Sequence, residues 1–191
     1  MQIDDQWNLV ITVNDTVRIF HVPISKAVFE ANFRILSATK ADIFGNGNQY
    51  AFLSGLNVAA LTLKDVGRRL AKQFNEDEGS DSGAAALLAE LRRCSTVLVP
   101  SATGYEILPL SSALSAKAIS AEDWEDAENQ LVFFTSAVWL TPRKTRREAA
   151  KVLADIMSCS LTSSNAEEYA SGLRTSAPAN APGTPALSVP T

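Results

Sequence analysis

The apolar segment that ends at Pro142 constrains the fold of this chain more than any other part of the sequence. Apolar residues recur there at spacings of three and four, which predicts a helix over residues 121–141. Phe133, Trp139 and Leu140 lie outside this stripe, so apolar side chains surround almost the whole helix. Such a helix is either buried on all sides or presents one side to a partner. The stripe consists of Trp124, Ala127, Leu131, Phe134 and Val138.

Amphipathic patterns and capping residues predict further helices before and after this segment. The first begins near Ser25, a good N-cap, and carries Phe29, Phe33 and Leu36 on one face. The short link after the apolar helix predicts that this helix and the next one form an antiparallel hairpin. The other predicted helices cover residues 59–74, 84–94, about 143–158 and about 164–173.

Runs of apolar residues predict two short β-hairpins. The first spans residues 7–23, with Asn14-Asp15 as a two-residue turn, because both residues tolerate positive φ. Pro23 ends it, since proline has no amide to donate to a strand ladder. A minor hairpin is predicted from the runs Thr96–Val99 and Tyr105–Leu108. A lone hairpin is not stable in water, so we expect the first one to pack on the helices.

The combined pattern predicts an α+β protein that is mainly α-helical. We expect one globular domain over residues 1–174, in which an N-terminal β-hairpin (about 7–23) packs on a helical body (about 25–173). Residues 175–191 contain no charged residue and several prolines among Ala, Ser and Thr. Such a composition does not bury enough apolar surface to fold, so we expect a flexible, disordered C-terminal tail.

Charge and residue usage narrow the chemistry that the chain can perform. The 191 residues include 17 Lys and Arg against 21 Asp and Glu, and a net charge of -4 argues against a dedicated nucleic-acid binder. One His and two Cys (His21, Cys94 and Cys159) do not supply the four ligands of a structural zinc site. A lone His also gives a nucleophilic Cys little prospect of a base, so we expect no enzyme, no metal and no cofactor.

The sequence shows no targeting or membrane-spanning segment. The first residues lack a basic stretch followed by a long apolar run, which a secretory signal would require. The longest apolar run, residues 131–140, has about half the length that a membrane span needs. We therefore expect a cytoplasmic protein that does not interact with a membrane.

A basic cluster follows the apolar helix directly. It could be a solvated helix face, a surface for an acidic protein partner, or a contact with RNA or DNA. We place a protein partner on the helical hairpin, while the alternative is that Phe133 and Trp139 belong to the core. The partner-binding candidates are Phe133, Trp139, Leu140, Arg143, Lys144, Arg146 and Arg147.

Several stretches together are similar to a known family. They are Asn57–Asp65 (NVAALTLKD), Tyr105–Leu110 (YEILPL), Asn129–Thr135 (NQLVFFT) and Glu168–Ser176 (EYASGLRTS). With the N-terminal hairpin and the Pro/Ala tail, the chain resembles tail assembly chaperones of long-tailed bacteriophages that infect Gram-negative bacteria. No part of this pattern is a catalytic signature.

The resemblance implies a function in virion assembly in the host cytoplasm. Such chaperones bind the tape measure protein, keep it soluble while the tail tube protein polymerises around it, and are absent from the mature virion. Many exist in a second, longer form that arises by a programmed ribosomal frameshift. The alternatives are a structural tail or head-tail connector or completion protein of the virion, or a small cytoplasmic adaptor.

Overall fold

The computed structural model describes residues 7–45, 55–77, 79–102 and 104–175, which fold around an antiparallel sheet. The sheet has five strands in the order β4-β3-β2-β1-β5. The two predicted hairpins, β1–β2 and β3–β4, are confirmed, and β2 pairs with β3 to join them. The strands are β1 (Asn8–Thr12), β2 (Arg18–His21), β3 (Ser95–Ser101), β4 (Gly104–Pro109) and β5 (Ser160–Thr162).

The turn of the first hairpin is longer than the predicted two residues. Thr12 pairs with Arg18, and the chain between them closes with a hydrogen bond from the Val13 amide to the Val17 carbonyl. The Asn14 side-chain oxygen accepts from the backbone amides of Thr16 at 3.0 Å and Val17 at 2.8 Å. The Asn14 side chain therefore stabilises a wider loop, as Asn often does in turns.

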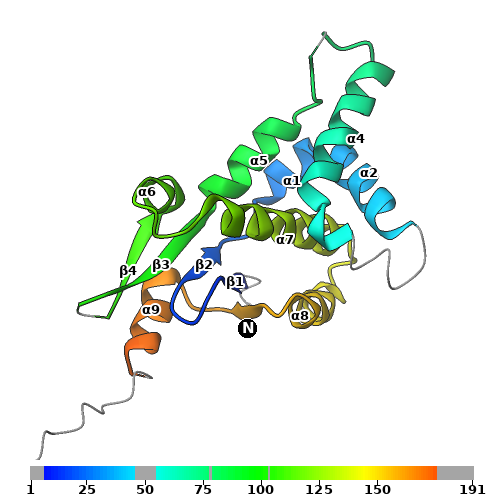
Figure 1. The fold of residues 1–191 in the computed structure, drawn as a ribbon. Coiled ribbons are helices and arrows are strands. Elements are labelled where there is room, and N and C mark those ends of the chain that lie inside the picture. Colours follow the sequence, from blue (N-terminus) through cyan, green and yellow to red (C-terminus); the bar gives the residue numbers. More distant parts are fainter. Residues whose placement is uncertain (1–6, 46–54, 78, 103, 176–191) are drawn as a thin grey trace, which may run out of the picture.

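Helices make up most of the structure, so the predicted α+β fold with mainly helical content is confirmed. Figure 1 shows α7 across the sheet, with α1, α2, α4 and α5 beyond it. No helix in the described part of the chain is both long and apolar enough to cross a membrane. The helices are α1 (Lys26–Ala31), α2 (Phe33–Phe44), α4 (Ala59–Gln73), α5 (Ala84–Arg93), α6 (Leu110–Ser115), α7 (Ala121–Trp139), α8 (Arg146–Ile156) and α9 (Ala166–Thr175).

Both faces of the sheet carry apolar side chains, and each face has its own core. Leu9, Ile19 and Val97 point toward the large core, which α2, α4, α5 and α7 also line. Their strand neighbours Val10, Phe20 and Leu98 point the other way and pack on Ala170 of α9. This two-sided burial explains why the strands read as nearly continuous apolar runs rather than strict alternations.

The C-terminal helix α9 completes the second core. Asn165 caps it, since its side-chain oxygen accepts from the Glu168 amide at 2.9 Å and the Glu168 carboxylate accepts in return from the Asn165 amide. Tyr169 packs its ring 6.0 Å from that of Phe20 on β2. The helix runs to Thr175, and the rest of the predicted tail lies outside the described residues.

Helix α7 is the central element of the large core. All side chains from Leu131 to Val138 are buried, so for this part of the helix the structure shows the first of the two alternatives, burial on nearly every side. Its buried polar residues bind neighbouring helices. Asn129 accepts from the Ala60 amide at 2.9 Å in the first turn of α4, and Glu128 forms an ion pair with Arg92 of α5 at 2.7 Å.

Helices α4 and α5 pack closely because Gly67 has no side chain. A Cβ atom at this position would lie 2.2 Å from the Asp81 carbonyl oxygen and 2.9 Å from the Ala84 Cβ. The first of these separations is far shorter than a van der Waals contact. Glycine is therefore required by packing, although it lowers the intrinsic helix propensity of α4.

Candidate functional site

Phe133 does not belong to an exposed surface, so its prediction as a partner contact is wrong. Its side chain has no exposed area, and its ring stacks on Phe44 of α2 with centroids 5.0 Å apart. The helix is apolar on nearly every face, and the face that carries Phe133 packs on α2. For this residue the alternative interpretation, a place in the core, is correct.

Trp139, at the end of α7, lies in a row of aromatic rings that reaches the surface. Its indole stacks on Phe29 of α1 with centroids 5.1 Å apart and an interplanar angle of 16°. Phe29 in turn contacts Phe33 of α2 edge-on at 6.0 Å. Trp139 and Phe29 are half-buried, whereas Phe33 is 52% exposed. We call Phe33, Phe29 and Trp139 the aromatic row.

Arg146 holds the end of this row in place. Its guanidinium lies 5.0 Å from the centroid of the Trp139 ring and donates to the backbone carbonyls of Trp139 at 3.3 Å and Thr141 at 3.2 Å. These carbonyls lie at the end of α7 and just after it, where intrahelical donors are missing and positive charge is favourable. Arg146 therefore has a structural role in addition to its charge.

The other predicted cations belong to the same stretch of chain as Arg146. Arg143, Lys144 and Arg147 are exposed, and Leu140 is half-buried before them. Residues 143–147, which we call the basic segment, contain four cations and no carboxylate. Among the candidates, the structure shows a direct contact between Trp139 and Arg146, and it leaves out Phe133.

The exposed aromatic residues of α2 and α4 were not predicted as site residues. The sequence pattern placed Phe33 on one face of a single helix that begins near Ser25, together with Phe29 and Leu36. The helix instead ends at Asn32, which lies between α1 and α2, and Phe33 becomes the first residue of α2. Asn32 is the sequence signal for this break, because Asn is common at helix ends. Next to Phe33, the Arg34 guanidinium lies 4.2 Å above the exposed Phe74 ring.

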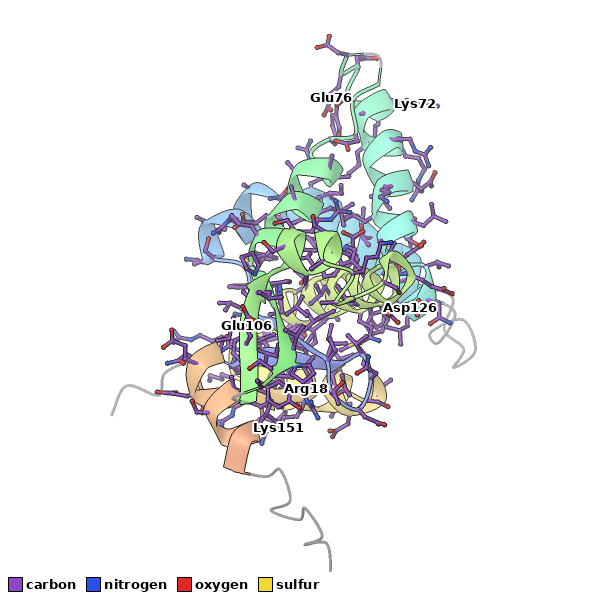
Figure 2. All side chains as sticks on the ribbon, turned by 60° about the vertical axis from the view of Figure 1, so that its left-hand side comes forward. Arg18, Lys72, Glu76, Glu106, Asp126 and Lys151 are labelled. Atoms are coloured by element: carbon purple, nitrogen blue, oxygen red, sulfur yellow. The ribbon has the colours of Figure 1, made fainter. Side chains whose placement is uncertain are left out.

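Most other charged residues are spread over the surface. In Figure 2, Lys72 and Glu76 lie at one end of the molecule, while Arg18 and Lys151 lie toward the other. Exposed apolar residues also occur apart from the aromatic row, as Val58 and Leu61 on α4 and as Val152 and Ile156 on α8. The aromatic row stands out because its rings contact one another and Trp139 also contacts Arg146 of the basic segment.

The residues weighed for catalysis occupy buried or half-buried positions. Burial lowers the pKa of His21 to about 4, and His21 Nδ1 lies 2.9 Å from the Ser95 hydroxyl. Burial raises the pKa of the Cys94 thiol and raises that of Cys159 to about 12. Both thiols are therefore protonated at neutral pH, which makes them weak nucleophiles. Among the described residues, no three His, Cys, Asp or Glu side chains gather into a group that could hold a metal ion.

Comparisons of the chain with family models, with curated proteins and with solved structures find no match. The candidate site is accordingly defined by this chain's own geometry. It consists of the aromatic row, Arg146 and the flanking basic segment, which together form a surface of apolar rings beside positive charge.

Proposed function

We propose that this protein is a tail assembly chaperone of a long-tailed bacteriophage, which binds the tape measure protein and keeps it soluble during tail tube assembly. The observation that carries the proposal is the aromatic row, an apolar surface that reaches solvent at Phe33 and contacts Arg146 of the basic segment at Trp139. Contiguous apolar residues with a polar margin are typical of protein-binding surfaces. The resemblance of the sequence to tail assembly chaperones supports the same function.

The surface suits reversible binding of an apolar client. Aromatic residues contribute large contact areas at small entropic cost, and neighbouring charges mainly speed association and select the partner. No step of this function requires a catalytic residue, a metal or a cofactor. In this proposal the chaperone acts in the host cytoplasm, meets the tail tube protein and a frameshifted longer form of itself there, and is absent from the mature virion.

Co-expression with the tape measure protein of the same phage tests the proposal. We expect the tape measure protein to be insoluble alone and soluble with the wild-type chain. The Phe33→Ser variant should lose this effect, whereas Val152→Ser, which removes an equally exposed apolar side chain from α8, should retain it. A tape measure protein that stays insoluble in the presence of the wild-type chain would contradict the proposal.

Mass spectrometry of purified virions separates the chaperone from a structural tail or connector protein. A chaperone is absent or present in traces, whereas a structural component is present at stoichiometric copy number. Stoichiometric presence in the virion would overturn the proposal in favour of a structural role.

A further inference from the structure

We infer that the aromatic row and the basic segment together bind an amphipathic helix that carries acidic residues along the margin of its apolar face. This inference names the class of client segment that the site recognises, and it rests on the proposed function. Three features of the surface support it: the secondary structure that forms it, its charge, and the ring faces that are already occupied.

The surface is formed by helices and a loop, so it has no strand edge to offer. Its residues come from α1, from the start of α2, and from the end of α7 through the start of α8. The carbonyls of Trp139 and Thr141 already accept hydrogen bonds from Arg146. A client bound here must satisfy its own backbone hydrogen bonds, and a helix is the segment that does so while presenting an apolar face.

The charge of the surface favours an acidic client. The basic segment carries four cations within five residues, while the whole chain has a net charge of -4. Outside the basic segment the chain has 13 Lys and Arg against 21 Asp and Glu, so an acidic helix is attracted more to this segment than to the rest of the protein. Such complementarity sets the orientation of the client and raises the rate of encounter, and salt weakens it.

The packing of the rings favours an aliphatic client over a nucleic acid. Single strands bind proteins by stacking their bases on free aromatic faces. Here Phe29 already stacks on Trp139, and the Arg146 guanidinium lies over the same indole. Phe33 is 52% exposed and remains for contact, and a single exposed ring accommodates Leu, Ile or Val side chains of a helix better than a series of stacked bases.

Two synthetic peptides test the inference. Both form amphipathic helices of equal length with the same apolar face, but one carries Glu and the other Lys along the margins. We expect fluorescence anisotropy to show that the wild-type protein binds the Glu peptide roughly tenfold more tightly at low salt. High salt should reduce this preference. Equal affinities for the two peptides at low salt would overturn the inference.

Variants of the aromatic row and the basic segment test whether the Glu peptide binds to this surface. Phe33→Ser should weaken Glu-peptide binding roughly tenfold at any salt concentration, and Lys144→Glu combined with Arg147→Glu should do so at low salt only. Lys117→Glu is the matched control, because Lys117 is also exposed but lies before α7, at the opposite end of this helix from Trp139. The 19 residues of α7 span about 28 Å. Circular dichroism and thermal unfolding verify that each variant is folded. Glu-peptide binding that both surface variants leave unchanged would overturn the inference.

The outcomes distinguish this inference from the proposed function. If the protein keeps the tape measure protein soluble but does not bind the Glu peptide, the inference fails and the function stands. If it binds the Glu peptide through this surface but does not keep the tape measure protein soluble, the proposed function fails. A labelled single-stranded oligonucleotide that competes with the Glu peptide for the surface would contradict the choice of a protein client.

Discussion

Mild acid should destabilise this protein through one buried side chain, His21. The Ser95 hydroxyl donates to the Leu91 carbonyl at 2.8 Å, so it accepts the hydrogen of His21 Nδ1 at 2.9 Å. His21 Nε2 has no hydrogen-bond partner among the described residues. A second proton on the ring would therefore be buried without an acceptor, and burial lowers the pKa of His21 from 6.5 to about 4.

The folded and unfolded chains differ in how readily they bind this proton. Above about pH 6.5 the ring is neutral in both states, and the full stability is present. Between about pH 6.5 and about pH 4 the unfolded chain binds a proton that the folded chain excludes, so the free energy of unfolding falls with pH. At about 1.4 kcal/mol per pH unit, the loss reaches about 2 kcal/mol near pH 5 and about 3 kcal/mol near pH 4.

Urea unfolding followed by tryptophan fluorescence at about pH 7, 6 and 5 measures this loss. The chain has one histidine, and carboxyl groups titrate mainly below this range. A change in the free energy of unfolding between these pH values is therefore assigned to His21. The control is His21→Asn, which keeps an amide donor toward Ser95 but does not ionise. The variant should be less stable than the wild type, and its free energy of unfolding should stay constant between about pH 7 and pH 5. A wild-type free energy of unfolding that is equal at pH 7 and pH 5, or that falls equally in the variant, would refute this account.

Five substitutions test the packing described above, each by chemical denaturation. Gly67→Ala should destabilise the protein by about 2 kcal/mol, because the new Cβ meets a backbone carbonyl at 2.2 Å. Phe133→Ala should cost about 3–5 kcal/mol, since the ring is fully buried, whereas Phe33→Ala should cost about 1 kcal/mol. Arg146→Ala should cost about 1–2 kcal/mol, because it removes the hydrogen bonds to the Trp139 and Thr141 carbonyls. Arg147→Ala should cost under about 0.5 kcal/mol, because Arg147 is exposed.

Each of these predictions has an outcome that contradicts it. An unchanged or raised stability of Gly67→Ala would mean that α4 and α5 do not pack as closely as described. Equal losses for Phe133→Ala and Phe33→Ala would contradict the difference in burial between the two rings. Equal effects of the two arginine substitutions would show that Arg146 does not stabilise the end of α7.

Local sequence patterns were sufficient to predict the long helices and the two hairpins. The spacing of apolar residues predicted α4, α5 and α7 closely, because each helix buries a defined set of positions. The pairing of β2 with β3, by contrast, joins segments more than seventy residues apart, and no local pattern encodes it. Strand β5 has only three residues, too few for an alternation to be recognised.

The candidate site was predicted in part, for similar reasons. The basic segment and Trp139 are apparent from residue types alone. Phe133 was misplaced because a helix that is apolar all round gives no indication of which faces are covered. Phe33 was not named as a site residue because the periodicity predicted one continuous helix, whereas Asn32 divides it into α1 and α2.

The pairing of β1 with β5 has a consequence for synthesis on the ribosome. Leu9 of β1 pairs with Leu161 of β5. Strand β1 therefore cannot pair with β5 until almost all of the described chain has been made. At about 5–20 residues per second, this delay is on the order of ten seconds. The apolar side chains of Val10 and Phe20 stay uncovered by α9 over the same period, and Leu98 stays so from its own synthesis onward, because α9 is the last of the described helices to be made. During translation the sheet is thus incomplete, with an unpaired edge at β1 and an uncovered apolar face. The C-terminal elements β5 and α9 are required to cover both.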